Sequence, residues 1–263
     1  MRKNIIALLT DFGTSDSYVG VMKGVILSIS PDARIVDITH HITPQNIDEA
    51  AYILWSCYRF FPQGTIFVSI VDPGVGSKRK ILCVETDNHV FIAPDNGLLR
   101  YVLSSVHTQN VVEVSNRKYF LSEVSSTFHG RDVFTPVAAH LARGLAIHEL
   151  GAPVIPEFGR EWFTVVDPKK RESYPGKVLH IDRFGNLVTS FLLERETELT
   201  STIQIGQFRI SGFCSAYSDA ASNEPFIVRG SSKLLEISLK NDNAAKFLGA
   251  NVGQEISMRV ESL

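Results

Sequence analysis

Long apolar runs alternate with helically spaced apolar positions along the first 150 residues. Residues 4–11 (NIIALLTD) form a run without polar alternation, which is typical of a strand buried on both faces. Further strands are expected at 33–39, 66–72, 80–87 and 89–97, and helices at 17–30, 47–58, 97–105 and 132–145. Thr43 and Pro44 suit the N-cap and first-turn positions of the second helix. Strands that alternate with helices predict a layered α/β domain with a mostly parallel sheet.

The pattern changes after residue 150. Residues 151–176 hold four prolines and are typical of a connection between domains. Short strand-like runs follow at 177–191, 202–210, 226–230, 234–240 and 255–260, and a helical pattern returns only at 243–249. We therefore expect an N-terminal α/β domain over 1–165 and a smaller, all-β, barrel-like C-terminal domain over 175–263.

Composition narrows the class of protein. Of the 263 residues, 44% are hydrophobic and 21% charged, as in soluble globular proteins, and the net charge of −2 gives no basis for a nucleic-acid or membrane partner. Three scattered cysteines indicate neither a disulfide framework nor a zinc site. Asp11 interrupts the first apolar run before it reaches the length of an export signal. We expect a cytoplasmic protein.

Acidic residues follow two of the predicted strands. Asp11 comes directly after ALLT and Asp72 directly after VSIV. In open α/β sheets, ligands bind beyond the carboxyl ends of the strands, so both carboxylates fall where a site is expected. Aspartate also caps turns routinely, and that alternative stays open for each of them. The stretch 72–80 (DPGVGSKRK) lacks the ending of a phosphate-binding loop, which argues against nucleoside triphosphates.

Histidines supply further candidates. His129 lies just before the helix expected from Asp132, and a histidine at a helix N-terminus is kept neutral and can act as a base. The alternative is a structural turn histidine. His40 and His41 could join the acids in a metal site, but their spacing matches no metal motif, so we expect no metal.

The clearest pattern of the second domain is HIDRFGNLVTS at 180–190. Asp182 and Asn186 can together hold an ammonium and a carboxylate, and Phe184 can stack on a flat ring or a cation. A hairpin turn with FGN at its tip explains the same residues without any ligand.

Five segments together resemble one enzyme family: LLTDFGTSDSYVGVMKG, VDPGVGSKRK, APDNGLL, TFHGRDVF and IDRFGNLVTS. They are similar to the S-adenosyl-L-methionine (SAM) hydroxide adenosyltransferases, the adenosine-forming SAM hydrolases, which are relatives of the SAM-dependent fluorinase and chlorinase. The resemblance covers nearly the whole chain. It implies hydrolysis of SAM to adenosine and L-methionine without a cofactor. It also implies a homotrimer that binds the substrate between domains of neighbouring subunits.

The resemblance also implies a catalytic set of Asp72, Arg79 and His129. The glycine turn would fold Arg79 back beside Asp72, where both can hold one water. Either Asp72 or His129 could take the proton of that water, and the sequence leaves this choice open.

Substrate contacts are implied in the same way. Asp11 would hold the ribose hydroxyls, and Asp182 and Asn186 the amino-acid end, with Phe184 lining that pocket. A contact between Asn186 and the nucleoside is the alternative. The adenine-binding and neighbouring positions correspond to Ser190, Ser232, Glu236 and Ala244. Here the chain departs from the family, with RGSSKLLEI in place of a pattern nearer NSFGLLEI and with Ser190 where asparagine is more usual.

Three other functions compete with hydrolysis. A SAM or adenosine sensor would bind without much turnover, and a metal-dependent phosphoesterase would use Asp11, Asp72 and the histidines. Halogenation is disfavoured because the halogenase pattern TYPATGT has a hydroxyl where this chain has Val75. The halogenases also carry tyrosine and serine at the positions of His129 and Gly130.

Overall fold

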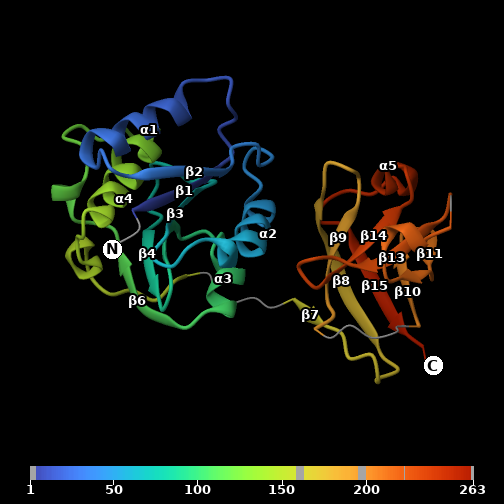
Figure 1. Ribbon diagram of the computed structural model, residues 1–263. Coiled ribbons are helices and arrows are strands. Elements are labelled where there is room, and N and C mark those ends of the chain that lie inside the picture. The colour runs from blue at the N-terminus through green and yellow to red at the C-terminus, as the bar shows by residue number, and fades with distance from the viewer. Residues whose placement is uncertain (1–3, 158–162, 195–199, 222, 262–263) are drawn as a thin grey trace. The chain divides into compact units, whose positions relative to one another are not determined.

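The apolar runs of the two halves of the chain gather into separate hydrophobic clusters. The computed structural model describes residues 4–157, 163–194, 200–221 and 223–261. The chain divides into two compact units, Met1–Glu161 and Trp162–Leu263, and each is described by itself (Figure 1).

The first unit alternates strands and helices, as the sequence predicts. Its elements are, in chain order, β1 (Ile5–Thr10), α1 (Tyr18–Ile29), β2 (Arg34–Thr39), α2 (Ile47–Cys57), β3 (Ile66–Ile70), β4 (Ile81–Thr86), β5 (Val90–Pro94), α3 (Arg100–Ser105), β6 (Thr108–Glu113) and α4 (Thr135–Ala142). Short 3₁₀ turns lie at Tyr58–Phe60, Arg117–Tyr119 and Ile147–Leu150, and a π-helical turn, Gly130–Phe134, leads into α4.

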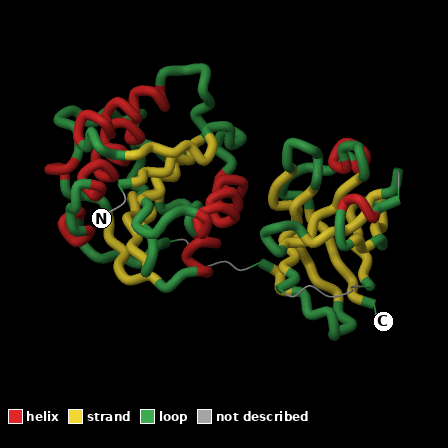
Figure 2. Tube along the Cα trace, in the orientation of Figure 1, coloured by secondary structure: helices red, strands yellow, loops and turns green. Residues whose placement is uncertain are grey.

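A six-stranded sheet with the order β2-β1-β3-β5-β4-β6 forms the centre of this unit. Strands β2, β1, β3 and β5 pair in parallel, and only β4 runs antiparallel to its neighbours β5 and β6. Helices α1 and α4 contact each other and α2 contacts α3, so that one helical layer lies on each face of the sheet (Figures 1 and 2). The predicted layered, mostly parallel α/β domain is confirmed.

The central strands are buried on both faces because a helical layer covers each. All five residues of β3 are buried, as are the last five of β1. On one face, Met22 and Ile26 of α1 belong to the same core as Leu8 of β1. Phe67 and Phe91 stack with ring centroids 4.9 Å apart. Full burial of such side chains stabilises the fold by about 1.5–3 kcal/mol each.

Two helix starts differ from the expectation. Helix α2 begins at Ile47 with Asn46 as its N-cap, because the Asn46 side chain accepts a hydrogen bond from Glu49 N. Thr43 is therefore not the cap, and its backbone N–H is taken up by the Glu49 carboxylate at 2.9 Å. The chain at Asp132 forms a π-helical turn, and the α-helix starts only at Thr135.

The second unit is nearly all β. Its elements are β7 (Thr164–Val165), β8 (Ser173–Ile181), β9 (Leu187–Leu192), β10 (Ser201–Ile205), β11 (Phe208–Ile210), β12 (Phe213–Cys214), β13 (Pro225–Arg229), β14 (Leu234–Leu239), α5 (Ala244–Leu248) and β15 (Glu255–Val260), with a 3₁₀ turn at Tyr217–Asp219. The strands follow the order β11-β10-β15-β8-β9-β14-β13-β12, and β7 pairs with β9. Strand β11 contacts β13 from the far side of this order, so the sheet curls into the expected barrel-like form.

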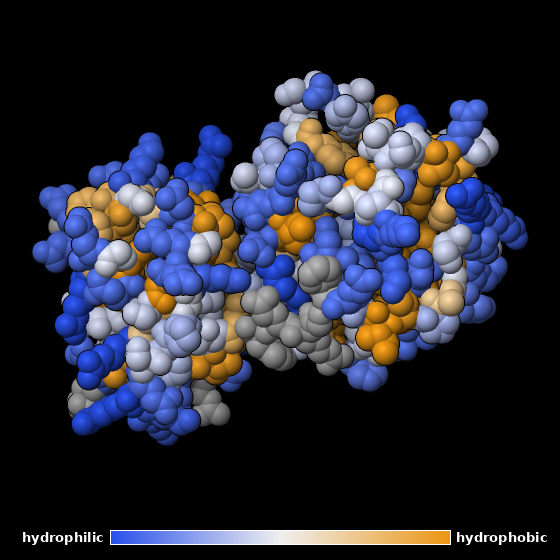
Figure 3. Space-filling model, turned by 180° about the vertical axis from the view of Figure 1, so that it is seen from behind, coloured by the Kyte–Doolittle hydropathy of each residue, from blue (hydrophilic) through white to orange (hydrophobic). Residues whose placement is uncertain are grey.

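The surface mixes polar and apolar residues. On the face shown in Figure 3, hydrophobic residues lie in separate patches among hydrophilic ones. Phe184 is 78% exposed, an unusual position for a phenylalanine and one that a ligand would help to explain. No described helix is long and apolar enough to cross a membrane.

Candidate active site

The turn after β3 folds Arg79 back onto Asp72. Backbone hydrogen bonds from Val75 N to Asp72 O and from Ser77 N to Gly74 O close this turn. Arg79 Nε then donates to Asp72 Oδ2 at 2.8 Å, and Arg79 Nη2 donates to the same oxygen. The Asp72 and Arg79 side chains are only 5% and 11% exposed, so water screens this ion pair little.

Gly76 allows the same turn to touch the segment that precedes His129. Its φ is +78°, and a Cβ at this position would lie 2.3 Å from the carbonyl oxygen of Ser126. Any side chain here would force the two segments apart. The close approach therefore depends on glycine.

His129 completes the set on the other side of Arg79. Arg79 Nη2 lies 3.0 Å from His129 Nδ1. Because a guanidinium only donates, Nδ1 must accept this hydrogen bond, and the proton of the neutral ring is on Nε2. The structure thus brings Asp72, Arg79 and His129 together, with Arg79 in the middle.

Burial is the main reason that the pKa of His129 lies below its ordinary value. The charge of Arg79 lowers this pKa further, whereas the carboxylates of Asp72 and Asp132 oppose the shift. His129 is therefore neutral at neutral pH. This is the form that can accept a hydrogen bond from Arg79.

The second carboxylate oxygen of Asp72, Oδ1, is not bound by Arg79. Asp72 Oδ1 is buried and has no hydrogen-bond partner in the part of the chain that the structure describes. An unpaired, buried carboxylate oxygen is costly, so this atom is expected to accept a hydrogen bond from a bound molecule. It is the free acceptor of the set.

The Asp11 turn lies close to this set. The rings of Phe12 and Phe128, which are neighbours in sequence of Asp11 and His129, lie 6.0 Å apart, and Tyr18 packs against both. Gln45 N donates to Asp11 Oδ2 at 2.8 Å, which fixes the direction of that carboxylate.

Several cavities lie in this unit. One, of about 590 Å³, is lined by His129, Gly76 and Ser125 together with Arg117 and Lys118, so the flank of the Asp72–Arg79–His129 set is open to a cavity.

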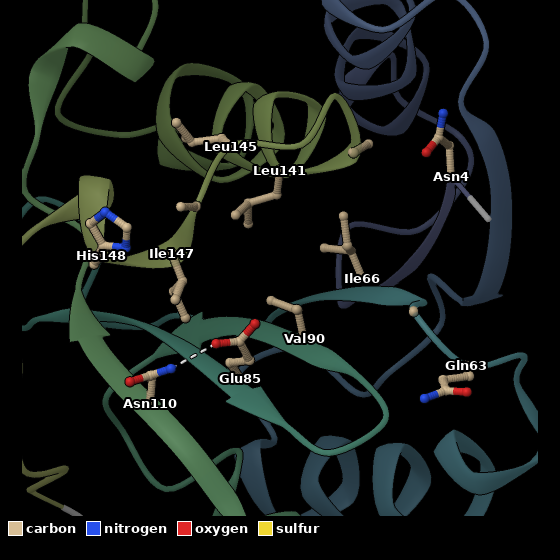
Figure 4. A pocket seen from close by; sticks show the side chains of 13 residues that line it. Asn4, Gln63, Ile66, Glu85, Val90, Asn110, Leu141, Leu145, Ile147 and His148 are labelled. Carbon is tan, nitrogen blue, oxygen red and sulfur yellow. Dashed lines mark hydrogen bonds between the residues drawn. The ribbon is translucent and has the colours of Figure 1, made fainter. Parts of the chain in front are cut away.

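Another cavity, of about 640 Å³, lies near the amino ends of β3 and β5 (Figure 4). Ile66 and Val90 line it beside Glu85 and Asn110, whose side chains are hydrogen-bonded at 2.7 Å. None of the residues predicted for the site lines this cavity, because Asp11 and Asp72 lie beyond the opposite ends of the strands.

In the second unit, Asp182 organises the turn between β8 and β9. Its Oδ1 accepts from Phe184 N and Asn186 N, and its Oδ2 accepts from Asn186 Nδ2, all at 2.9 Å. Gly185 at the tip has a φ of +90°, and Ala245 N donates to its carbonyl oxygen, which joins the turn to α5. The segment therefore forms a hairpin turn, and this turn leaves Phe184 exposed.

Glu236 lies near this turn and has a partner that the sequence did not reveal. Tyr217 Oη donates to Glu236 Oε2 at 2.7 Å. Burial is the main reason that the pKa of Glu236 is raised, and the nearby charge of Asp182 raises it further, while Tyr217 opposes the shift. Only the long-range fold places Tyr217 here, and no motif in the sequence indicates it.

The remaining predicted residues differ in how they are used. Ser190 is 7% exposed, and its hydroxyl accepts from Lys177 N at 3.0 Å, so it holds β8 to β9. Ser232 Oγ has no partner among the described residues. Ala244 is fully buried at the start of α5. Asn243, which caps α5, packs its side chain against Gly185 and was missed by the sequence analysis.

The residues proposed for a metal site do not gather. Among the described residues, no group of three histidine, cysteine, aspartate or glutamate side chains could hold a metal ion. His40 is buried and hydrogen-bonded to Thr10, and His41 lies near Thr14. The phosphoesterase hypothesis therefore has no metal site in the described part of the chain.

Comparison with known proteins gives a consistent result for both units. Two family models match the chain: the SAM hydroxide adenosyltransferase N-terminal domain over residues 6–151 and the corresponding C-terminal domain over residues 176–257. A protein named (R)-S-adenosyl-L-methionine hydrolase from Methanocaldococcus jannaschii is 36% identical, and the match covers 97% of this chain and 95% of that protein. One of the same name from Thermus thermophilus is 31% identical, over 96% of this chain and 98% of that protein.

More distant and structural relatives fit the same picture. A fluorinase from an Actinoplanes species is 31% identical, but over only 71% of each chain. A crystal structure of an uncharacterized conserved protein from Thermotoga maritima superposes with a TM-score of 0.87 at 34% identity, over 97% of this chain and 99% of that one.

Proposed function

The chain belongs to the SAM hydroxide adenosyltransferase family, and we propose that it hydrolyses SAM to adenosine and L-methionine through Asp72, Arg79 and His129. The observation that carries the assignment of roles is the arrangement of Arg79 between Asp72 and His129. It leaves Asp72 Oδ1 as the acceptor of these three side chains that no described residue pairs with.

The reaction needs little acid catalysis. SAM carries a positive sulfonium, so methionine leaves as a neutral thioether when water attacks the ribose C5′. Water supplies the new C–O bond, the C–S bond breaks, and one proton is released. What remains for the enzyme is to hold the water in line with that bond, and such positioning can lower the barrier by about 7–11 kcal/mol.

Asp72 is the group that we assign as proton acceptor. His129 Nδ1 already accepts from Arg79, and its Nε2 carries the proton, so the neutral ring has no free acceptor. The attacking water becomes strongly acidic as its oxygen bonds to carbon, and a carboxylate is then a sufficient base. Such general base catalysis contributes about 10²–10⁴-fold. Arg79 stabilises the developing hydroxide, and His129 fixes Arg79.

The other predicted residues serve the substrate in this proposal. Asp11 holds the ribose hydroxyls through Oδ1, since Oδ2 is taken by Gln45 N. In the second unit, the Asp182 turn takes the amino-acid end with Phe184 and Asn186.

Ser232, Glu236 and the backbone at Ala244 bind the adenine. At Ala244 the backbone serves, because the buried side chain has no polar group. Ser190 keeps a supporting role between strands. The resemblance further implies a homotrimer, which light scattering of the purified protein would test.

Hydrolysis is favoured over halogenation by the extent of the matches. The hydrolase relatives match 95% or more of this chain, whereas the fluorinases match about 71–72%. The turn after β3 also presents Val75, which offers no hydroxyl to a halide.

The test is chromatography of the purified protein incubated with SAM, beside Arg79→Ala. We expect adenosine and methionine to appear in equal amounts with the wild type. Arg79→Ala should be slower by at least about 10²-fold, because the cation that stabilises the hydroxide is gone. Tight adenosine binding without any product would instead support the sensor hypothesis.

A further inference from the structure

A chain of polar side chains, buried at its inner end and exposed at its outer end, lies behind the Asp11 turn. Thr10, the last residue of β1, is fully buried, and its Oγ1 lies 2.9 Å from Nδ1 of His40, which is 3% exposed. On the other side of the ring, His40 Nε2 lies 3.0 Å from Asp37 Oδ1. Lys23 Nζ donates to the second oxygen of Asp37 at 2.6 Å. The chain of contacts therefore runs from the β1 terminus to the surface.

One protonation state satisfies all of these contacts. Burial by itself would raise the pKa of Asp37, but Lys23, which donates a hydrogen bond to it, and the nearby His40 ring outweigh burial and hold that pKa below its usual range. His40 Nε2 faces Asp37 Oδ1 at ion-pair distance, without the alignment of a hydrogen bond. Asp37 is therefore a carboxylate that only accepts, which places the His40 proton on Nε2. His40 Nδ1 then accepts from the Thr10 hydroxyl, and the same hydroxyl oxygen accepts from Phe12 N at 3.2 Å.

His40 also holds the Asp11 turn through its backbone. Gly13 N donates to His40 O at 2.7 Å. Five residues later, Gln45 N donates to Asp11 Oδ2. Gln45 has a φ of +66°, a strained conformation for a residue with a side chain, so the surrounding contacts must hold it in place. The segment from His40 to Gln45 thus sets both the path of the turn and the direction of its carboxylate.

We infer that His40 is a positioning residue for the Asp11 carboxylate, acting through Thr10 and through the turn that they share. The inference rests on the proposed function in one respect, namely that Asp11 holds the ribose diol. His40 itself touches no substrate. The imidazole accepts a hydrogen bond from the Thr10 hydroxyl, and the oxygen of that hydroxyl accepts from Phe12 N. Together these bonds keep Asp11 Oδ1 directed toward the ribose.

The test measures recognition of the diol by itself. Calorimetry gives the dissociation constants of adenosine and of 2′,3′-dideoxyadenosine, and their ratio reports the contribution of the ribose hydroxyls. Three variants separate the two ring nitrogens. In His40→Gln the glutamine amide lies near the position of Nε2, so the hydrogen bond with the Thr10 hydroxyl is lost. In His40→Asn the asparagine amide lies near the position of Nδ1, so the hydrogen bond with the Thr10 hydroxyl is kept. Thr10→Val removes the hydroxyl at nearly constant shape.

We expect the wild type to prefer adenosine by about tenfold or more, as one or two charge-assisted hydrogen bonds would give. His40→Gln and Thr10→Val should lose most of this preference, and His40→Asn should keep it. His89→Gln is the matched control, because His89 is 7% exposed and packs against Phe67 and Phe91 in the same unit. It should lose stability but keep the preference.

Retention of the wild-type preference in His40→Gln would overturn the inference, and so would a wild type that shows no preference. Equal losses in both His40 variants and in His89→Gln would reduce His40 to an ordinary core residue. SAM turnover is recorded on the same samples. A wild type without turnover, whose diol preference His40→Gln removes, would refute the proposed function while supporting the inference.

Discussion

At the scale of single residues, the proposed chemistry depends on how three side chains share their hydrogen bonds. Arg79 has donors for both neighbours, so it occupies one oxygen of Asp72 and the accepting nitrogen of His129. Asp72 Oδ1 remains without a hydrogen-bond partner among the described residues. The roles of the acid and the histidine therefore differ, although either alone could serve as a base.

The pH dependence of the reaction should reveal the state of His129. Because its pKa in the folded protein lies below the ordinary value near 6.5, the unfolded chain binds more protons between these two values. Stability should rise with pH through that window and be lost as pH falls through the lowered pKa. kcat/KM should also fall as the pH falls through the lowered pKa of His129, since a protonated ring cannot accept a hydrogen bond from Arg79.

His129→Asn provides the comparison, because its amide oxygen can accept from Arg79 and does not titrate. Its acid limb should be flat in a pH–rate profile. His140, whose pKa is also lowered by burial, lies on α4 away from the set, and His140→Asn should keep the wild-type limb. An acid limb unchanged in His129→Asn would assign the titration to another group.

At the scale of elements, the site depends on turns more than on strands. The strands end in register at one edge of the sheet, and the turns after β1 and β3 then carry Asp11, Asp72 and Arg79. Gly76 lets the second of these turns touch Ser126, just ahead of His129.

Gly76→Ala should therefore impair both stability and turnover. Gly64→Ala separates the two causes, because Gly64 has a similar φ of +84° but nothing within 4 Å of its added Cβ. Left-handed strain should cost about 1–2 kcal/mol in both variants by denaturant unfolding. Only Gly76→Ala should also lose turnover, since its methyl group meets a carbonyl oxygen at 2.3 Å. Equal turnover in the two variants would mean that the contact with Ser126 does not matter.

Sequence patterns predicted most elements but not those without a strong signal. Strands β1 and β3 were predictable because burial on both faces leaves a continuous apolar run. Strand β6 was missed, because it is an edge strand with the sequence TQNVVE and only one fully buried residue. The N-cap of α2 was assigned to Thr43, whereas Asn46 is the cap, because its side chain accepts from Glu49 N while the Glu49 carboxylate takes up Thr43 N.

At the scale of the whole molecule, the predicted groups are divided between two units with separate cores. The Asp72–Arg79–His129 set lies in the first, and the Asp182 turn and Glu236 lie in the second. Binding of the amino-acid end and chemistry at C5′ should therefore be separable by mutation.

Asp182→Asn tests this separation. The asparagine oxygen can still accept from Phe184 N and Asn186 N, and its amide nitrogen can donate to Asn186 once that side chain turns its oxygen inward. The charge that would attract the substrate ammonium is lost. We expect KM for SAM to rise by about tenfold, the loss of one charge-assisted hydrogen bond, while adenosine binding stays unchanged. Glu255→Gln, an exposed acid on β15 of the same unit, should change neither. A loss of adenosine binding in Asp182→Asn would assign Asp182 to the nucleoside instead.

The sequence by itself determined the class of each unit and the family. It also determined the positions of Asp11 and Asp72 after their strands, because apolar periodicity and turn residues are local signals. The tertiary structure decided which polar atoms of the site have hydrogen-bond partners in the described part of the chain and which remain open to a ligand. Arg79 meets His129 across 50 positions of the chain, Thr10 meets His40 across 30, and Tyr217 meets Glu236 across 19. Such pairings depend on how strands and turns pack in three dimensions, and no local pattern of residue types encodes them.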